Sequence, residues 1–201
     1  LVPRRELAID DWYQLLETVK HPEHSVEIGI AGKYIELHDA YKSIYESLTH
    51  AGIANRAKVR LRKVAAEQIA TQGAEALLAG VDAVLVPGGF GERGFEGKIA
   101  TIAWARKNRI PFFGICYSMQ AAVVEYARHV CGIEKATTAE YAPQAEHRVI
   151  DLMEEQKKVT ELGGTMRLGA FDCRLSHGTI SREEYGQDLI SERHRHRFEL
   201  N

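Results

Sequence analysis

One stretch of the chain decides the fold, Ile110-Pro-Phe-Phe-Gly-Ile-Cys-Tyr-Ser-Met-Gln120. Its apolar first half predicts a strand over 110–115, and the run from Met119 to Arg128 predicts a helix. Cys116 lies on the bend between them, with a small residue two positions away on each side, which is the pattern of a nucleophile elbow. Because a helix N-terminus lowers the pKa of a thiol and the thiolate is the nucleophile, the stretch predicts acyl chemistry at Cys116. The alternative is a buried structural thiol, since free cysteines are often buried.

Segments of the same kind precede this bend. Strand-like runs cover 26–31, 58–64 and 81–86, and helix-like runs cover 39–51, 65–78 and 97–108. This alternation predicts an α/β fold with a doubly wound, mostly parallel central sheet and flanking helices. Ligands bind such sheets at the carboxyl ends of the strands. The glycine loop Pro87-Gly-Gly-Phe-Gly-Glu-Arg-Gly94 follows one of these strands, so we expect it to face Cys116.

The two ends of the chain are less regular. Residues 1–25 are interpreted as a linker with a short helix at 10–19, and residues 1–4 as a natural linker or a remnant of an engineered protease site. Residues 26–201 are interpreted as one domain. Its C-terminal part is predicted to be small and irregular, with a hairpin between 165–169 and 171–175 and a short helix at 183–192.

Composition excludes several classes of function. The chain has 201 residues, 45% of them hydrophobic, and a formal charge of -2, so no global field favours nucleic acid or a membrane. The basic stretch Arg193–Arg197 is too short to predict nucleic-acid binding, and no apolar run is long enough for a transmembrane helix. The odd set Cys116, Cys131 and Cys173 predicts a reducing, cytoplasmic setting without disulfides, with Cys131 and Cys173 as packing residues. Without a Cys-x-x-Cys pair we expect no metal site.

Ordered motifs make the chain resemble the glutamine amidotransferase domain of CTP synthases from about Val26 to Asn201. Two of them, the glycine loop and the cysteine bend, also occur in other class I amidotransferases. Three look particular to the CTP synthases, namely Gly32-Lys-Tyr-Ile-Glu-Leu-His-Asp-Ala-Tyr-Lys-Ser43, Gly163-Gly-Thr-Met-Arg-Leu-Gly169 and Glu192-Arg-His-Arg-His-Arg-Phe-Glu199.

The resemblance implies a flavodoxin-like domain that hydrolyses L-glutamine to glutamate and ammonia without a cofactor of its own. It further implies a separate synthase domain of the same polypeptide, absent here, that uses the ammonia with ATP and Mg²⁺ to convert UTP to CTP. GTP is the implied activator, and the full-length enzyme is implied to be a homotetramer without nucleic-acid or membrane partners.

The matching motifs also imply roles for particular residues. Cys116 is the nucleophile, and the glutamine contacts are Gly89, Tyr117, Ser118, Met119, Gln120, Glu140 and Arg197. Among these, Gly89 and the Tyr117 N–H flank the oxyanion, Glu140 suits the ammonium of glutamine, and Arg197 suits its carboxylate. Tyr34, Lys42 and Arg93 are the candidates for the GTP surface; ordinary surface or core contacts are the alternative.

The chain departs from the family pattern in three places. Tyr117-Ser118 stands where Leu-Gly is usual, and Thr137-Thr-Ala-Glu-Tyr141 replaces Asn-Ser-Thr-Glu-Phe. The third departure is that the triad's His-x-Glu pair, usually His-Pro-Glu near the C-terminus, is not reached before Asn201. A His21-Pro-Glu23 precedes the first predicted strand, where we interpret it as coincidence.

The missing pair leaves alternatives open. Either residues beyond Asn201 supply it, or the domain is incomplete and we expect little glutaminase turnover, because a thiol without a positioned histidine lacks its base. The competing interpretations are another cysteine hydrolase of the same fold, such as a peptidase-like relative, and a non-catalytic regulatory or assembly module.

Overall fold

The computed structural model describes residues 9–157 and 166–200. Its main sheet has four parallel strands in the order β2-β1-β3-β4. The strands are β1 (His24–Gly32), β2 (Ala57–Ala65), β3 (Ala83–Val86) and β4 (Phe112–Gly114). The intervening helices are η1 (His38–Tyr41), α2 (Lys42–Ala54), α3 (Ala66–Gln72), α4 (Ala74–Leu78) and α5 (Phe95–Asn108), and α6 (Tyr117–His129) follows β4. The predicted doubly wound parallel sheet is confirmed, and its strand order is the flavodoxin-like one.

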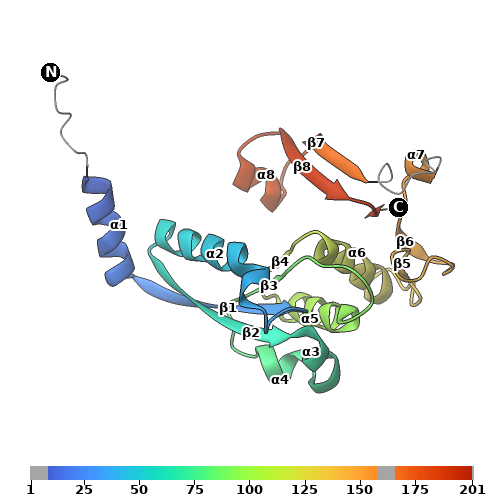
Figure 1. The fold of residues 1–201 in the computed structure, drawn as a ribbon, viewed down its shortest axis with the longest axis horizontal. Coiled ribbons are helices and arrows are strands. Elements are labelled where there is room, and N and C mark those ends of the chain that lie inside the picture. Colours follow the sequence, from blue (N-terminus) through green and yellow to red (C-terminus); the bar gives the residue numbers. More distant parts are fainter. Residues whose placement is uncertain (1–8, 158–165, 201) are drawn as a thin grey trace.

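Helices cover both faces of this sheet (Figure 1). Successive strand residues point to opposite faces, so Ile30 and Leu85 pack with Tyr45 of α2 on one side. On the other side Val84 packs with Leu78 of α4. A third apolar cluster joins α5 and α6 to strand β6 (Arg148–Asp151), and so ties the C-terminal part to the sheet domain.

The predicted helix over 65–78 is two helices. Gly73 lies between α3 and α4 with φ 87°, a left-handed conformation that breaks the run of helical hydrogen bonds. The N-terminal helix α1 (Asp10–Lys20) forms as predicted and projects away from the sheet (Figure 1), and none of its residues is buried. The possible tag remnant at 1–4 and the Gly163-Gly164 turn lie outside the described residues.

The C-terminal part contains two small sheets. One has the order β5-β6-β9, with β5 (Thr137–Thr138) and β9 (Glu199–Leu200) on either side of β6. The other pairs β7 (Arg167–Arg174) with β8 (Leu189–His196) in antiparallel register. The short helices are α7 (Glu154–Lys157) and α8 (Ile180–Tyr185).

The hairpin predicted within 165–175 was wrong. Gly169 lies inside the continuous strand β7, where it pairs with His194, so the chain does not turn there. The helix predicted over 183–192 is also displaced, because α8 ends at Gly186 in a left-handed cap and β8 follows. Among the residues the structure describes, no helix is both long and apolar enough to cross a membrane.

Candidate active site

A cavity of about 460 Å³ opens where strands β3 and β4 end. It is lined by Gly89, Phe90, Cys116, Tyr117, Gln120, Glu140, Met166, Arg195, His196, Arg197 and Phe198. The structure therefore brings together six of the sequence-predicted site residues, Cys116, Gly89, Tyr117, Gln120, Glu140 and Arg197. The lining comes from the glycine loop, the first turn of α6, the segment after β5 and the end of β8.

The bend at Cys116 has the backbone of a nucleophile elbow. Cys116 has φ 52° and ψ -110°, a conformation that non-glycine residues rarely adopt, and α6 begins at the next residue. Gly114 is required by the tightness of the bend, because a Cβ there would lie 2.8 Å from the carbonyl oxygen of Ser118. The glycine loop reaches the same point, since a Cβ on Gly88 would lie 3.5 Å from the Cβ of Cys116.

The thiol of Cys116 is not ionised by its position alone. Burial raises its pKa above the ordinary value, and this outweighs the lowering by the Tyr117 N–H and by the Lys98 charge, while Glu140 raises the pKa further. The N–H group at the helix N-terminus thus lowers the pKa of Cys116 as expected, but burial has the larger effect and the pKa is raised overall. Cys116 is partly exposed beside the cavity, whereas Cys131 and Cys173, predicted as packing residues, are both exposed.

Tyr117 and Ser118 fasten the bend to the glycine loop. The Tyr117 hydroxyl donates to the carbonyl oxygen of Gly91 at 2.7 Å, and the Ser118 hydroxyl donates to that of Pro87 at 2.5 Å. Ser118 is fully buried and does not line the cavity, and Met119 is 39% exposed outside it. Their side chains are therefore not placed to contact a molecule in the cavity.

The polar residues that line the cavity include three from separate elements, Gln120, Glu140 and Arg197. The carboxylate of Glu140 accepts the Gly91 N–H at 2.6 Å, which ties it to the glycine loop. The Gln120 amide donates to the carbonyl oxygen of Phe198 at 2.6 Å, and so holds the segment after β8 against α6. Gln156 donates to the carbonyl oxygen of Arg197 at 2.9 Å, which fixes the backbone that carries the guanidinium. The cavity thus offers a nucleophile, a carboxylate and a guanidinium.

Sequence reasoning missed a histidine at the cavity wall. The Nδ1 atom of His196 lies 3.4 Å from a carboxylate oxygen of Glu199, and His196 lines the cavity together with Cys116. The family resemblance implies His-x-Glu, whereas this pair has the spacing His-x-x-Glu across the end of β8. Its signal was within the Glu192–Glu199 motif, which sequence reasoning used only for Arg197.

The structure gathers one set of potential metal ligands among the described residues, His194, His196 and Glu199. Their ligand atoms lie within 4.8 Å of one another, and two histidines with one glutamate are a ligand set that zinc uses. The Arg167 guanidinium, however, lies 3.9 Å from the same Glu199 carboxylate, so its positive charge opposes a divalent cation there.

The predicted effector residues fall on a different surface. The Arg93 guanidinium lies 5.5 Å from the ring centroid of Tyr34, and Lys33 lies 5.5 Å from the same ring. Lys33 also donates to the carbonyl oxygen of Phe90, which lines the cavity, at 3.1 Å. Lys42 is exposed at the start of α2. Tyr34 and Arg93 are therefore neighbours, and Lys33 is the residue beside them that sequence reasoning missed.

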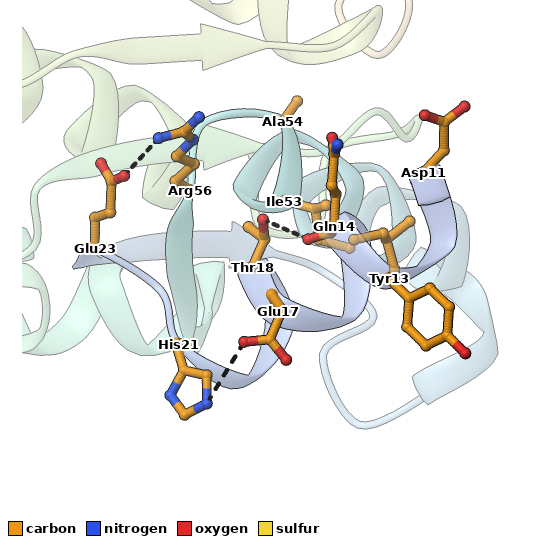
Figure 2. A pocket seen from close by; sticks show the side chains of 11 residues that line it. Asp11, Tyr13, Gln14, Glu17, Thr18, His21, Glu23, Ile53, Ala54 and Arg56 are labelled. Carbon is orange, nitrogen blue, oxygen red and sulfur yellow. Dashed lines mark hydrogen bonds and ion pairs between the residues drawn. The ribbon is translucent and has the colours of Figure 1, made fainter. Parts of the chain in front are cut away.

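The His21-Pro-Glu23 segment lies at the opposite end of the sheet. It lines a separate hollow between α1 and the end of α2 (Figure 2). There His21 lies 4.0 Å from Glu17, and Glu23 pairs with Arg56 at 2.7 Å. The nine residues of β1 follow this segment, and their far end is about 25 Å away. His21 is therefore not placed to serve Cys116, as expected of a coincidental match.

The fold and this cavity define the class of protein, and comparison with known proteins agrees. The family model described as glutamine amidotransferase class-I matches residues 36–201. The chain belongs to the class I glutamine amidotransferases. Among solved structures, the Trypanosoma brucei CTPS glutaminase domain with bound acivicin superposes with a TM-score of 0.79 at 36% identity, covering 88% of this chain and 68% of that one. Within the class, the chain therefore belongs to the glutaminase domains of CTP synthases.

Curated relatives place the chain in the same family. The CTP synthase of Clostridium beijerinckii is 50% identical over 197 residues, which are 98% of this chain and 37% of that protein. The CTP synthase of Caldanaerobacter subterraneus subsp. tengcongensis is 48% identical over 200 residues. The chain thus spans a little over a third of the length of these relatives.

Proposed function

We propose that this chain hydrolyses L-glutamine at Cys116. The observation that carries the proposal is the single cavity in which a thiol on a strained elbow meets the glycine loop, the Glu140 carboxylate and the Arg197 guanidinium. Glutamine brings an ammonium, a carboxylate and a carboxamide. Glu140 suits the ammonium, and arginine suits the carboxylate in a bidentate geometry.

The reaction proceeds through a covalent intermediate. The sulfur of Cys116 attacks the carboxamide carbon, and the negative charge that forms on oxygen is received by the amide hydrogens of Gly89 and Tyr117. The C–N bond then breaks, and the nitrogen leaves as ammonia after accepting a proton. The glutamyl thioester that remains is cleaved by water to glutamate, which regenerates the thiol.

A proton carrier is needed because burial raises the pKa of the Cys116 thiol. Among the described cavity-lining residues, His196 is the one histidine. We assign it this role, with the Glu199 carboxylate 3.4 Å from Nδ1 as the nearby negative charge that favours its protonated form. The His-x-Glu pair that the family resemblance implies does not occur within residues 24–201.

We further propose that the ammonia serves a synthase domain of the same polypeptide, which aminates UTP to CTP with ATP and Mg²⁺. This follows from the names of the curated relatives, of which the chain spans 37%. GTP is the proposed activator at the surface around Tyr34 and Arg93, and the full-length enzyme is the proposed homotetramer. Three free cysteines support a cytoplasmic setting.

Covalent labelling tests the glutaminase proposal. Acivicin, an electrophilic amino acid, is incubated with the chain, and the modified peptide is located by mass spectrometry. We expect modification at Cys116, protection by L-glutamine but not by L-asparagine, and none at the exposed Cys173. Equal labelling of all three cysteines without protection would refute the proposal.

The same experiment separates the alternatives. A different cysteine hydrolase of this fold would label at Cys116 without a preference for glutamine. A non-catalytic module is the second candidate, and the raised pKa of the Cys116 thiol favours it. In that case Cys116 would be alkylated no faster than Cys173.

A further inference from the structure

A buried lysine lies beneath the candidate active site. Lys98 belongs to the second turn of α5, and its side chain is only 1% exposed. Its ammonium lies 2.8 Å from the carbonyl oxygen of Pro87, 2.9 Å from the hydroxyl oxygen of Ser118 and 3.5 Å from the carbonyl oxygen of Gly88. A charge is rarely buried unless it is paired or has a function, so its position needs a reason.

The contacts of Lys98 join two segments that must stay in register. Pro87 and Gly88 begin the glycine loop, and Ser118 lies in the first turn of α6, two residues after Cys116. The Ser118 hydroxyl itself donates to the carbonyl oxygen of Pro87 at 2.5 Å, so Pro87, Lys98 and Ser118 form a closed triangle of hydrogen bonds. We call these three residues the elbow latch.

Among the residues that the structure describes, none of the groups that accept a hydrogen bond from the Lys98 ammonium is a carboxylate. Its ammonium lies 5.2 Å from the ring centroid of Tyr117. Burial, and then the charge of Lys33, lower the pKa of Lys98 to about 8, while Cys116, Glu140 and Glu67 act in the opposite direction. Negative charge near Cys116 therefore stabilises protonated Lys98, and Lys98 in turn favours that negative charge.

We propose that Lys98 is a positioning residue that fastens the glycine loop to the nucleophile bend and places a positive charge near Cys116 at neutral pH. The inference rests on the proposed function, in which Cys116 is the nucleophile. The amide of Gly89 and that of Tyr117 come from the two segments that the latch joins. The latch thus sets the spacing of the two donors that receive the oxyanion.

The two residues that follow Cys116 both take part in holding the elbow. Ser118 supplies the hydroxyl that meets Lys98, and Tyr117 adds a second link through the carbonyl oxygen of Gly91.

Alkylation of Cys116 as a function of pH tests the proposal. Lys98→Met keeps the length and apolar stem of the side chain, and Lys107→Met removes an exposed charge from the same helix as the matched control. Rates with iodoacetamide are measured for each cysteine peptide from about pH 6 to about pH 10, with exposed Cys131 as the internal reference. We expect Lys98→Met to slow the alkylation of Cys116 about threefold at neutral pH, where the ammonium is charged, and to change it little near pH 10, where the ammonium has lost its proton. Lys107→Met should change the rate at neither pH.

A second variant separates the link from the charge. Ser118→Ala keeps the ammonium and removes the hydroxyl, so it should slow labelling of Cys116 by acivicin while slowing its alkylation by iodoacetamide at neutral pH less than Lys98→Met does. An unchanged alkylation rate at neutral pH in Lys98→Met, or unchanged acivicin labelling in Ser118→Ala, would overturn the proposal. If Lys98→Met does not fold, as judged by circular dichroism, the labelling of Ser118→Ala decides. Failure of the wild-type chain to react with acivicin would instead refute the proposed function, and the iodoacetamide rates at neutral pH would still decide the role of Lys98.

Discussion

The ammonium of Lys98 lies 2.9 Å from the hydroxyl oxygen of Ser118, so a fully buried cation contacts the helical turn that carries the nucleophile bend. Lys98 lies on a buried face of α5, three residues after Phe95 and four before Ile102, where the helix packs in the core. A charged residue at such a position is unfavourable for stability. Its retention fits a trade of stability for a positioned active site.

Lys98→Met should therefore stabilise the chain at neutral pH. The pKa of Lys98 is about 8 in the folded chain, below its ordinary value of 10.5, so the unfolded state binds more protons between these values. The destabilisation is complete below about pH 8 and is relieved as the pH rises toward 10.5, by up to about 3 kcal/mol. In urea unfolding, we expect the advantage of Lys98→Met to be larger at pH 7 than near pH 10. An advantage that is equal at both pH values would contradict this.

Glu140→Gln should separate substrate binding from thiol reactivity. The variant loses the charge that would meet the ammonium of glutamine, so labelling by acivicin at low concentration should fall by about 10- to 100-fold. Glu140 also raises the pKa of Cys116, so its removal should leave alkylation by iodoacetamide at neutral pH equal or slightly faster. A parallel loss of both reactivities would indicate damage to the fold instead.

His196→Ala tests the proposed proton carrier. Because the pKa of the Cys116 thiol is raised and the thiol is largely protonated at neutral pH, loss of a base in the cavity should slow acivicin labelling at pH 7 by about 100-fold and have less effect at alkaline pH. The measurement is the rate of acivicin labelling between pH 7 and alkaline pH. The matched control is His21→Ala, at the other end of the sheet. Equal rates for the two variants would refute the assignment to His196.

Arg93→Ala tests the proposed effector surface. Arg93 pairs with Glu67 at 2.5 Å and lies over the ring of Tyr34, so its guanidinium is held in place on the proposed effector surface. Titration calorimetry with GTP should show about tenfold weaker binding in the variant. Arg60→Ala, which removes an exposed arginine of β2, should bind GTP as the wild-type chain does. Equal loss in both variants would mean that only overall charge matters.

Glu125→Gln tests a buried ion pair of the core. Glu125 is 0% exposed and contacts Arg106 at 2.8 Å and His129 at 2.9 Å. Burial raises its pKa, but the hydrogen bonds from Arg106 and His129 outweigh this, so the pKa is lowered from 4.5. The pair therefore stabilises the fold above about pH 4.5, and this contribution is lost as the pH falls through the lower folded value.

We expect Glu125→Gln to cost about 3 kcal/mol of unfolding free energy at pH 7 and less near pH 3. The control Glu96→Gln removes an exposed partner of Arg128 and should cost less than about 1 kcal/mol. A pH-independent difference for Glu125→Gln would show that the loss comes from packing and not from charge.

The amino-acid sequence determined those features that depend on neighbouring residues. Apolar runs broken by glycine predicted every strand of the main sheet, and the small residues around Cys116 predicted the bend, because strand, turn and helix signals are local. Parallel strands carry their loops to one edge, so the glycine loop and Cys116 were expected to meet. Six of the residues that line the cavity, Glu140 and Arg197 among them, followed from the resemblance of the ordered motifs to those of the family, whereas His196 did not.

Only the tertiary structure decided what depends on distant partners. The local pattern predicted a turn near Gly169. The residue instead lies in β7 and pairs with His194 of β8, which the chain reaches only after helix α8. The sign of the Cys116 pKa shift depends on burial by elements that the local pattern does not contain. Lys98 can be buried because three oxygen atoms, from two segments that are separate in the sequence, accept hydrogen bonds from its ammonium. Such contacts arise between residues far apart along the chain, and the local pattern of side chains does not encode them one by one.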